Sequence, residues 1–180
     1  MIVLDIDLDY FFLPVFSGIL IPEEEKNSIY YKAPIQPIDI IDYFKLNEFS
    51  GDIKCFKSHD EVYYDLKKLN TINNNLIHID AHDDVEHSSL LKTVDLGNWI
   101  THSVLEDLIS PEIFWINQQI KKPYRSGYKV FNKDYYLNIS ELNYFKLKSK
   151  IDLIYITESI EFCPSNNIAE FFNQTLLACK

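Results

Sequence analysis

The stretch that decides the fold class is NLIHIDAHDD, residues 75–84. The part from Asn75 to Asp80 is a short apolar run that ends in an acid, which is typical of a buried strand. The part from Ala81 to Asp84 is a polar turn. The first acid therefore stands at the carboxyl end of a strand, where open α/β sheets place their binding sites.

Strands and helices are predicted to alternate on both sides of this stretch. Period-two alternation and short apolar runs predict strands, whereas apolar residues three and four apart predict helices. The expected strands cover residues 2–9, 52–56, 75–80, 112–116 and 152–157, and the expected helices cover 38–46, 59–69, 98–109 and 167–177. This alternation predicts a layered α/β fold around a parallel sheet.

The segments between these elements carry weaker patterns. Residues 14–37 contain prolines, a glycine and a charged run, so we expect a long loop that contacts a substrate or closes over it. Residues 117–127 are basic and contain a proline, which is typical of a loop. Residues 128–147 are aromatic, and their pattern leaves the type of element open.

The first predicted strand has an unusual face. Residues 2–9 alternate apolar and acidic side chains, so Asp5, Asp7 and Asp9 lie on one side of an extended chain. Such a face cannot be buried without a counter-charge. We therefore expect a cationic group opposite these acids.

The composition indicates one globular domain, residues 1–180. Hydrophobic residues make up 47% of the chain and aromatics 14%, which is enough for a packed core. No run approaches the ~18 apolar residues of a membrane span, and the acidic start is unlike a signal peptide. We therefore expect a cytoplasmic protein without a membrane partner. The widely spaced Cys55, Cys163 and Cys179 are expected to be free thiols.

The charge balance narrows the class of partner. The net charge is −10 and Arg125 is the single arginine, which argues against nucleic acid because a duplex-binding surface needs clustered Lys and Arg. An acidic surface suits a cationic partner. The alternative, which explains the charge equally well, is that the surface only keeps the protein soluble.

The polar turn offers carboxylates and an imidazole in close succession, from Asp80, His82, Asp83 and Asp84. Oxygen-rich sets with one or two imidazoles suit manganese or a related divalent ion, whereas zinc more often takes sulfur or several histidines. Carboxylates can also bridge two cations about 3.5–4 Å apart, which then act together on one water. The alternative is a polar turn in which an aspartate caps the next helix.

Residues 80–84, DAHDD, resemble the DAHxD element of the arginase and ureohydrolase superfamily. The chain is most similar to the compact peptide arginases, which convert arginine to ornithine inside ribosomally made peptides. The resemblance implies a three-layer arginase-like α/β fold, a mainly parallel sheet flanked by helices and two Mn²⁺ ions as cofactors. It makes Asp80, His82 and Asp84 metal ligands. His59, in the block KSHDE of residues 57–61, resembles the separate histidine ligand of the family.

Residues 4–11, LDIDLDYF, resemble the DxD element of the same family, which makes Asp7 and Asp9 metal ligands. In ordinary arginases this element follows DAHxD along the chain, whereas here it precedes it. The alternative register, with Asp5 and Asp7 as the ligands, therefore stays open.

Residues 159–164, SIEFCP, resemble the element that supplies the guanidinium-binding glutamate of the family. The resemblance implies that Glu161 holds the substrate, with Glu158 as its rival, and that Asp84 carries a proton from water to the leaving amine. His102 stands in a segment similar to one with a proton-shuttling histidine, and is otherwise a residue of a helix surface.

The resemblance implies hydrolysis of arginine side chains in a precursor peptide, with release of urea. No stretch matches the loops that hold the ends of free arginine, which favours the peptide. The alternatives are a ureohydrolase for a free guanidino compound, a deacetylase of a related fold and a non-catalytic metal-binding module. No functional role is expected for two other histidines. His78 is expected to be a buried, hydrogen-bonded core residue, and His87 is expected to face solvent.

Overall fold

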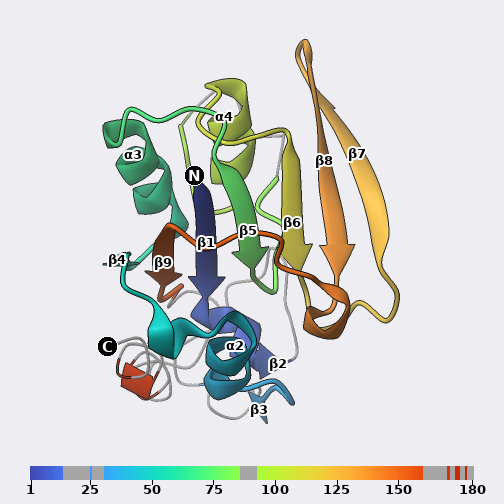
Figure 1. Ribbon diagram of the computed structural model, residues 1–180. Helices are drawn as coiled ribbons and strands as arrows, with labels where there is room; N and C mark the ends of the chain where they lie inside the picture. The colour runs from blue at the N-terminus through green and yellow to red at the C-terminus, as the bar shows by residue number, and fades with distance from the viewer. Residues whose placement is uncertain are drawn as a thin grey trace.

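Strand β1, Ile2–Asp7, is an inner strand of a seven-stranded sheet in the computed structural model, with the strand order β4-β9-β1-β5-β6-β8-β7 (Figure 1). The structure describes residues 1–13, 25, 31–85, 93–159, 170, 173–174 and 177. All neighbouring strands are parallel except β7 and β8, which are antiparallel. The other strands are β4 (Asp52–Phe56), β5 (Asn75–Ile79), β6 (Glu112–Ile116), β7 (Tyr124–Val130), β8 (Lys133–Ser140) and β9 (Leu153–Thr157).

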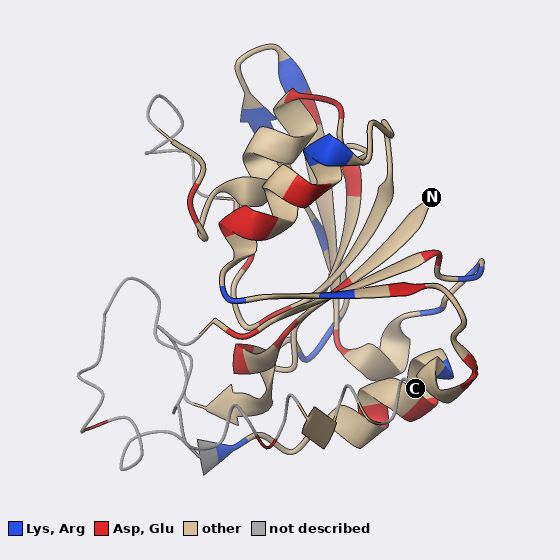
Figure 2. Cartoon of the chain, turned by 90° about the vertical axis from the view of Figure 1, so that its left-hand side faces the viewer, with Lys and Arg blue, Asp and Glu red and all other residues tan. Residues whose placement is uncertain are grey.

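Helices cover both faces of this sheet, as the view along its edge shows (Figure 2). Helix α2 (Pro37–Phe44) packs on one face, and helices α3 (His59–Lys68) and α4 (Trp99–Leu105) pack on the other. The predicted three-layer α/β fold with a mainly parallel sheet is therefore confirmed.

The alternation of side chains along β1 assigns its residues to the two layers. Leu4 and Ile6 belong to the hydrophobic cluster that includes α2, whereas Val3 belongs to the cluster of α3 and α4. Because side chains alternate along a strand, Asp5 and Asp7 point to the same side as Val3. The acids of β1 are therefore buried beneath α3 and α4.

The first strand ends earlier than predicted. It stops at Asp7, and Leu8–Phe11 form a 3-10 helix, η1, so Asp9 leaves the sheet. The cause is local: Oδ1 of Asp7 accepts a hydrogen bond from the backbone N–H of Asp9 at 2.9 Å, which caps the helical turn. Asp9 is thereby turned toward the loop after β5.

Residues 128–147, whose type of element the sequence pattern leaves open, contain most of an antiparallel hairpin. Strand β7 begins at Tyr124, inside the predicted loop, and β8 runs to Ser140. Most of β7 is exposed or only partly buried, so it lacks the apolar run of an inner strand. Gly127 lies opposite Tyr136, where a Cβ would come within 3.3 Å of the ring.

The remaining elements are short. Strands β2 (Phe12–Leu13) and β3 (Tyr31–Lys32) pair as a small second sheet, and η2 (Leu46–Glu48) and η3 (Leu142–Tyr144) are single 3-10 turns. Most of the loop predicted within 14–37 and most of the helix predicted over 167–177 lie outside the described residues. Among the described residues, no helix combines the length and the apolar character that crossing a bilayer requires.

Candidate metal centre

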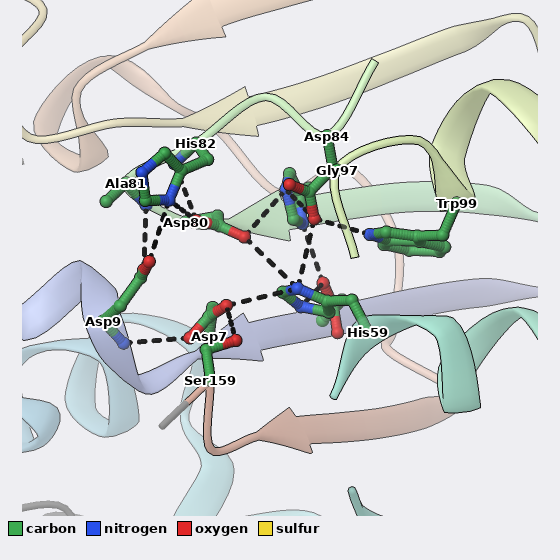
Figure 3. A network of polar contacts seen from close by, with 12 residues as sticks. Asp7, Asp9, His59, Asp80, Ala81, His82, Asp84, Gly97, Trp99 and Ser159 are labelled. Atoms are coloured by element: carbon green, nitrogen blue, oxygen red, sulfur yellow. Dashed lines mark hydrogen bonds and ion pairs between the residues drawn. The ribbon is translucent and has the colours of Figure 1, made fainter. Parts of the chain in front are cut away.

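Aspartates and histidines gather where four neighbouring parallel strands, β4, β9, β1 and β5, reach their carboxyl ends (Figure 3). The edge of an open α/β sheet places ligands there because the loops after the strands converge. All six residues predicted as metal ligands meet at this point: Asp7 from β1, Asp9 from η1, His59 from the start of α3, and Asp80, His82 and Asp84 from the loop after β5.

His59 stands at the centre of one group of acids. Its Nδ1 lies 3.2 Å from Oδ2 of Asp7, 3.1 Å from Oδ2 of Asp84 and 3.7 Å from Oδ2 of Asp80. The ring is 2% exposed and stacks on the indole of Trp99, with ring centroids 5.5 Å apart. Three carboxylate oxygens thus lie within 3.7 Å of one buried imidazole nitrogen.

His82 stands in a second group beside the first. Its Nδ1 lies 2.9 Å from Oδ2 of Asp9 and 3.7 Å from Oδ1 of Asp80. Asp80 therefore faces His82 with one carboxylate oxygen and His59 with the other. The two groups share this carboxylate.

The loop after β5 is shaped by its own polar groups. Oδ1 of Asp80 accepts a hydrogen bond from the backbone N–H of His82 at 2.7 Å, and Nδ2 of Asn117 donates to the carbonyl of Ala81 at 2.9 Å. Asp84 adopts φ 51°, the left-handed region that costs energy for a residue other than glycine. This turn directs Asp84 back toward His59, which matches the tendency of strained backbone to occur at functional sites.

Two further residues hold the cluster in place, and neither was singled out from the sequence. Nε1–H of Trp99 donates to Oδ2 of Asp84 at 2.6 Å, and the hydroxyl of Ser159 donates to Oδ2 of Asp7 (Figure 3). Both stand in sequence blocks that the family resemblance includes. Only the fold brings them to the acids, since each comes from a different element.

Asp5 and His78 form the floor of the cluster. Both are 0% exposed, and Nδ1 of His78 lies 2.7 Å from Oδ2 of Asp5. His78 is thus buried and hydrogen-bonded as expected, but its Nε2 also lies 3.2 Å from Oδ2 of Asp80. Asp5 contacts the outer nitrogen of His59, Nε2, at 3.2 Å. Donor atoms of Asp5, His59 and His78 also lie within 4.8 Å of one another. The choice between Asp7 with Asp9 and Asp5 with Asp7 as the ligand pair therefore stays a prediction.

The charges of the cluster are poorly balanced by protein groups alone. Five carboxylates of the described residues meet three imidazoles. Burial raises the pKa of Asp7 well above its ordinary value, and the negative charges of Asp9 and Asp80 raise it further. Burial and the charge of Asp80 likewise raise the pKa of Asp9 to about 7. Carboxylates that resist ionisation in this way are held next to one another without sufficient cation.

The pKa values of the imidazoles rise as well, which for histidine favours the charged form. Although burial lowers the pKa of His78, the charge of Asp80 and the hydrogen bond to Asp5 raise it to about 10. Burial also lowers the pKa of His82, but its hydrogen bonds to Asp80 and Asp9 raise it to about 12. The protein compensates its acids with protons on histidine, and a divalent cation would take their place.

The donor set fits a divalent ion. Bonds of about 2.0–2.6 Å from a divalent ion to nitrogen and oxygen place two donors of one ion at most about 5 Å apart. Within the described residues, donor atoms of Asp7, His59 and Asp80 lie within 4.8 Å of one another, and so do those of Asp9, Asp80 and His82. Oδ2 of Asp80 is buried without a well-aligned hydrogen bond among the described residues. The cluster can therefore hold metal ions.

Not all of the residues predicted to take part in catalysis lie within the part of the chain that the structure describes. His102 lies on α4, where its ring contacts Tyr63 of α3 with centroids 6.1 Å apart, so it stands between two helices. Glu158 is partly buried, and its backbone N–H donates to the carbonyl of Phe56. Glu161 and His87 lie outside the described residues. The roles given to His102, Glu158 and Glu161 stay predictions.

Solvent reaches the cluster at His82. Its side chain is 19% exposed, whereas none of the other five predicted ligands exceeds 5%. Among the described residues, the donor atoms are therefore most accessible from the side of His82. Comparisons of this chain with protein-family models, with curated proteins and with solved structures gave no match.

Proposed function

We propose that this protein is a dinuclear metal hydrolase of the arginase type that converts arginine side chains of a peptide to ornithine. The observation that carries the proposal is the carboxylate of Asp80, which directs its two oxygens at His59 and His82, each within its own group of acids. A bridging carboxylate between two imidazole-containing donor groups is the arrangement that two-metal hydrolases use.

The proposed ligands divide into two sets. Asp7, His59, Asp80 and Asp84 would hold one ion, and Asp9, Asp80 and His82 would hold the other. Two divalent ions, with manganese as the proposed metal, would supply the Lewis acidity that makes water a nucleophile at neutral pH. The resemblance of the sequence blocks to arginases supports this assignment.

The chain's own residues would complete the reaction. Glu161 would accept hydrogen bonds from the planar guanidinium group, which fixes its carbon for attack and favours a charged group over a neutral ureido group. Asp84 would take the proton of the attacking water and pass it to the amine that leaves. Water adds to the guanidinium carbon, the bond to the side-chain nitrogen breaks, and urea and ornithine result.

The substrate class rests on charge and on the missing sequence elements. A guanidinium group is cationic, and it would approach an acidic cluster in a chain of net charge −10. Recognition of free arginine requires dedicated polar groups for its charged ends, and no stretch of the chain matches the loops that supply them in arginases. An arginine within a precursor peptide is therefore the proposed substrate.

Metal analysis and a matched pair of assays test the proposal. The protein is loaded with Mn²⁺, and a peptide with an interior arginine is compared with free arginine. We expect two ions per chain, urea from the peptide and the mass change from arginine to ornithine in that peptide. Urea from free arginine alone would instead indicate an ordinary ureohydrolase, and release of acetate from an acetylated lysine peptide would indicate a deacetylase.

Glu161 is tested by its change to glutamine, with Glu158→Gln as the matched control. Glu161→Gln should leave the metal content intact and lower kcat/KM by about 10- to 1,000-fold, as expected for loss of a charged hydrogen-bonding pair. A loss confined to Glu158→Gln would transfer the substrate role to Glu158.

A further inference from the structure

Asp5 stands outside both proposed ligand sets, yet it is the most deeply placed acid of the cluster. It is 0% exposed, and its register neighbour on the adjacent parallel strand is His78. Neighbouring strands lie about 4.8 Å apart, so these two side chains meet on the same face of the sheet. A buried carboxylate needs compensating partners, because its desolvation is otherwise very costly.

One oxygen of Asp5 lies close to both inner imidazoles. Oδ2 is hydrogen-bonded to Nδ1 of His78 at 2.7 Å and lies 3.2 Å from Nε2 of His59, a close ion-pair contact without the alignment of a hydrogen bond. His59 in turn presents its other nitrogen, Nδ1, to the acids of the first ligand set. Asp5 therefore touches this imidazole from the side opposite to the proposed ion.

The two nitrogens of a neutral imidazole are coupled, because one carries the proton and the other carries the lone pair. A carboxylate beside Nε2 keeps the proton on that nitrogen, and Nδ1 is then left with the lone pair that a metal needs. Carboxylates that contact metal-binding histidines in this way fix the tautomer and the ring orientation.

We propose that Asp5 is a positioning residue that holds His59 in its metal-binding tautomer, and that His78 holds Asp5. The inference rests on the metal-binding part of the proposed function. It predicts a selective effect, since the contacts of Asp5 reach His59 and His78 but no contact joins it to His82 in the described residues.

Titration of the metal-free protein with Mn²⁺ tests this selectivity. Asp5→Asn should weaken binding of one ion by about 10- to 100-fold and leave the other at wild-type affinity. Asp65→Asn is the matched control, because Asp65 is a partly buried acid on α3 that pairs with Lys54 and Tyr155. It should bind both ions as the wild type does.

A double-variant cycle locates the effect. Adding Asp5→Asn to His59→Ala should cause no further change in Mn²⁺ binding, because the positioned imidazole is already gone. A further loss in that background would mean that Asp5 acts on the other ion and would overturn the inference. Equal loss of both ions in Asp5→Asn would overturn it as well. So would a wild-type protein that binds a third ion which Asp5→Asn does not bind, because Asp5 would then be a ligand itself.

Two substitutions of His78 decide the question if Asp5→Asn does not fold. His78→Asn keeps a donor nitrogen at the position of Nδ1, next to Asp5, whereas His78→Gln places its donor at the position of Nε2. We expect binding within about 3-fold of wild type for His78→Asn and a selective loss of one ion for His78→Gln. The reverse order, or no difference, would contradict the role of His78.

The outcomes separate the two proposals. Wild-type protein that binds two ions, with an Asp5→Asn variant that binds them equally well, would overturn the positioning role and leave the proposed function standing. Wild-type protein that binds no Mn²⁺ would overturn both.

Discussion

Metal binding should depend more on Asp80 than on any other residue of the cluster, because its carboxylate faces both His59 and His82. Asp80→Asn should therefore abolish binding of both ions and all turnover, since an amide neither neutralises nor bridges two cations. Asp83→Asn is the matched control, since Asp83 stands in the same loop but in none of the metal-binding groups of the described residues. Elemental analysis after gel filtration measures both, and retention of two ions by Asp80→Asn would refute the shared ligand.

Metal binding should depend on pH through Asp9 and His82. Burial and Asp80 raise the pKa of Asp9 to about 7, and Asp80 and Asp9 raise that of His82 to about 12 against the effect of burial. Both groups hold protons in the metal-free protein below pH 7, and both must release them to bind an ion. Affinity for Mn²⁺ should thus rise with pH, by up to about tenfold per unit for each proton released. Titrations at pH 5.5, 6.5 and 7.5 measure this, and an affinity that falls over this range would contradict it.

The residues of the candidate site differ in how far the sequence can predict them. Asp80, His82 and Asp84 follow one another after an apolar strand, so their common location is evident from local pattern. The contact of Asp5 with His78 is not evident from local pattern, because it requires knowing that β1 and β5 are neighbours and that Asp5 lies opposite His78. His78 alone resembles a core histidine, and its second contact, to Asp80, appears only in the fold.

Helix α4 contributes to the site through Trp99, which stacks on His59 and donates to Asp84. Trp99→Phe keeps an aromatic ring but removes the N–H donor. This substitution should weaken binding of the ion held by the His59 set by about 10-fold, as expected for a lost hydrogen bond to a charged ligand. Trp115→Phe is the matched control, since its indole donates to the backbone carbonyl of Asp80 rather than to a carboxylate. Equal Mn²⁺ affinity in the two variants would remove Trp99 from the site.

Helix α2 should matter to stability and not to metal binding, because it packs on the opposite face of the sheet. Ile40 is 1% exposed, and Ile40→Ala should lower the free energy of unfolding by about 2–5 kcal/mol. Ile38, on the same helix, is 55% exposed, so Ile38→Ala should cost little. Denaturant unfolding compares the two, and similar midpoints would contradict the packing of α2.

The elements themselves were predictable where one face of a segment is clearly apolar or buried. Strands β4, β5, β6 and β9 and helices α2, α3 and α4 agree with the periodicity, apart from a few residues at their ends. The hairpin of β7 and β8 was not predictable in this way, because an exposed outer strand lacks an apolar run. The turn η1 was also missed, since alternation continues through Asp9 while the cap by Asp7 ends the strand.

The molecule as a whole should gain stability from the ions that it binds. Each ion at 100 times its dissociation constant adds about 2.7 kcal/mol, which corresponds to about 5–10 °C in Tm for a chain of this size. Thermal unfolding with Mn²⁺ and with a chelator measures the difference, and Asp80→Asn serves as the control that should not respond. An equal Tm under both conditions in the wild type would argue against a preformed site.

The position of β1 between β5 and β9 has a consequence for how the chain folds. This strand pairs Val3 with Leu76 on one side and with Leu153 on the other, so both of its partners are far from it along the sequence. Contacts of such long range must be closed against a large loss of chain entropy, which slows folding. During synthesis Asp5, Asp7 and Asp9 emerge long before β9, so the sheet around them is completed only when β9 pairs with β1. The metal-binding geometry should therefore arise late in folding, once β9 has paired with β1.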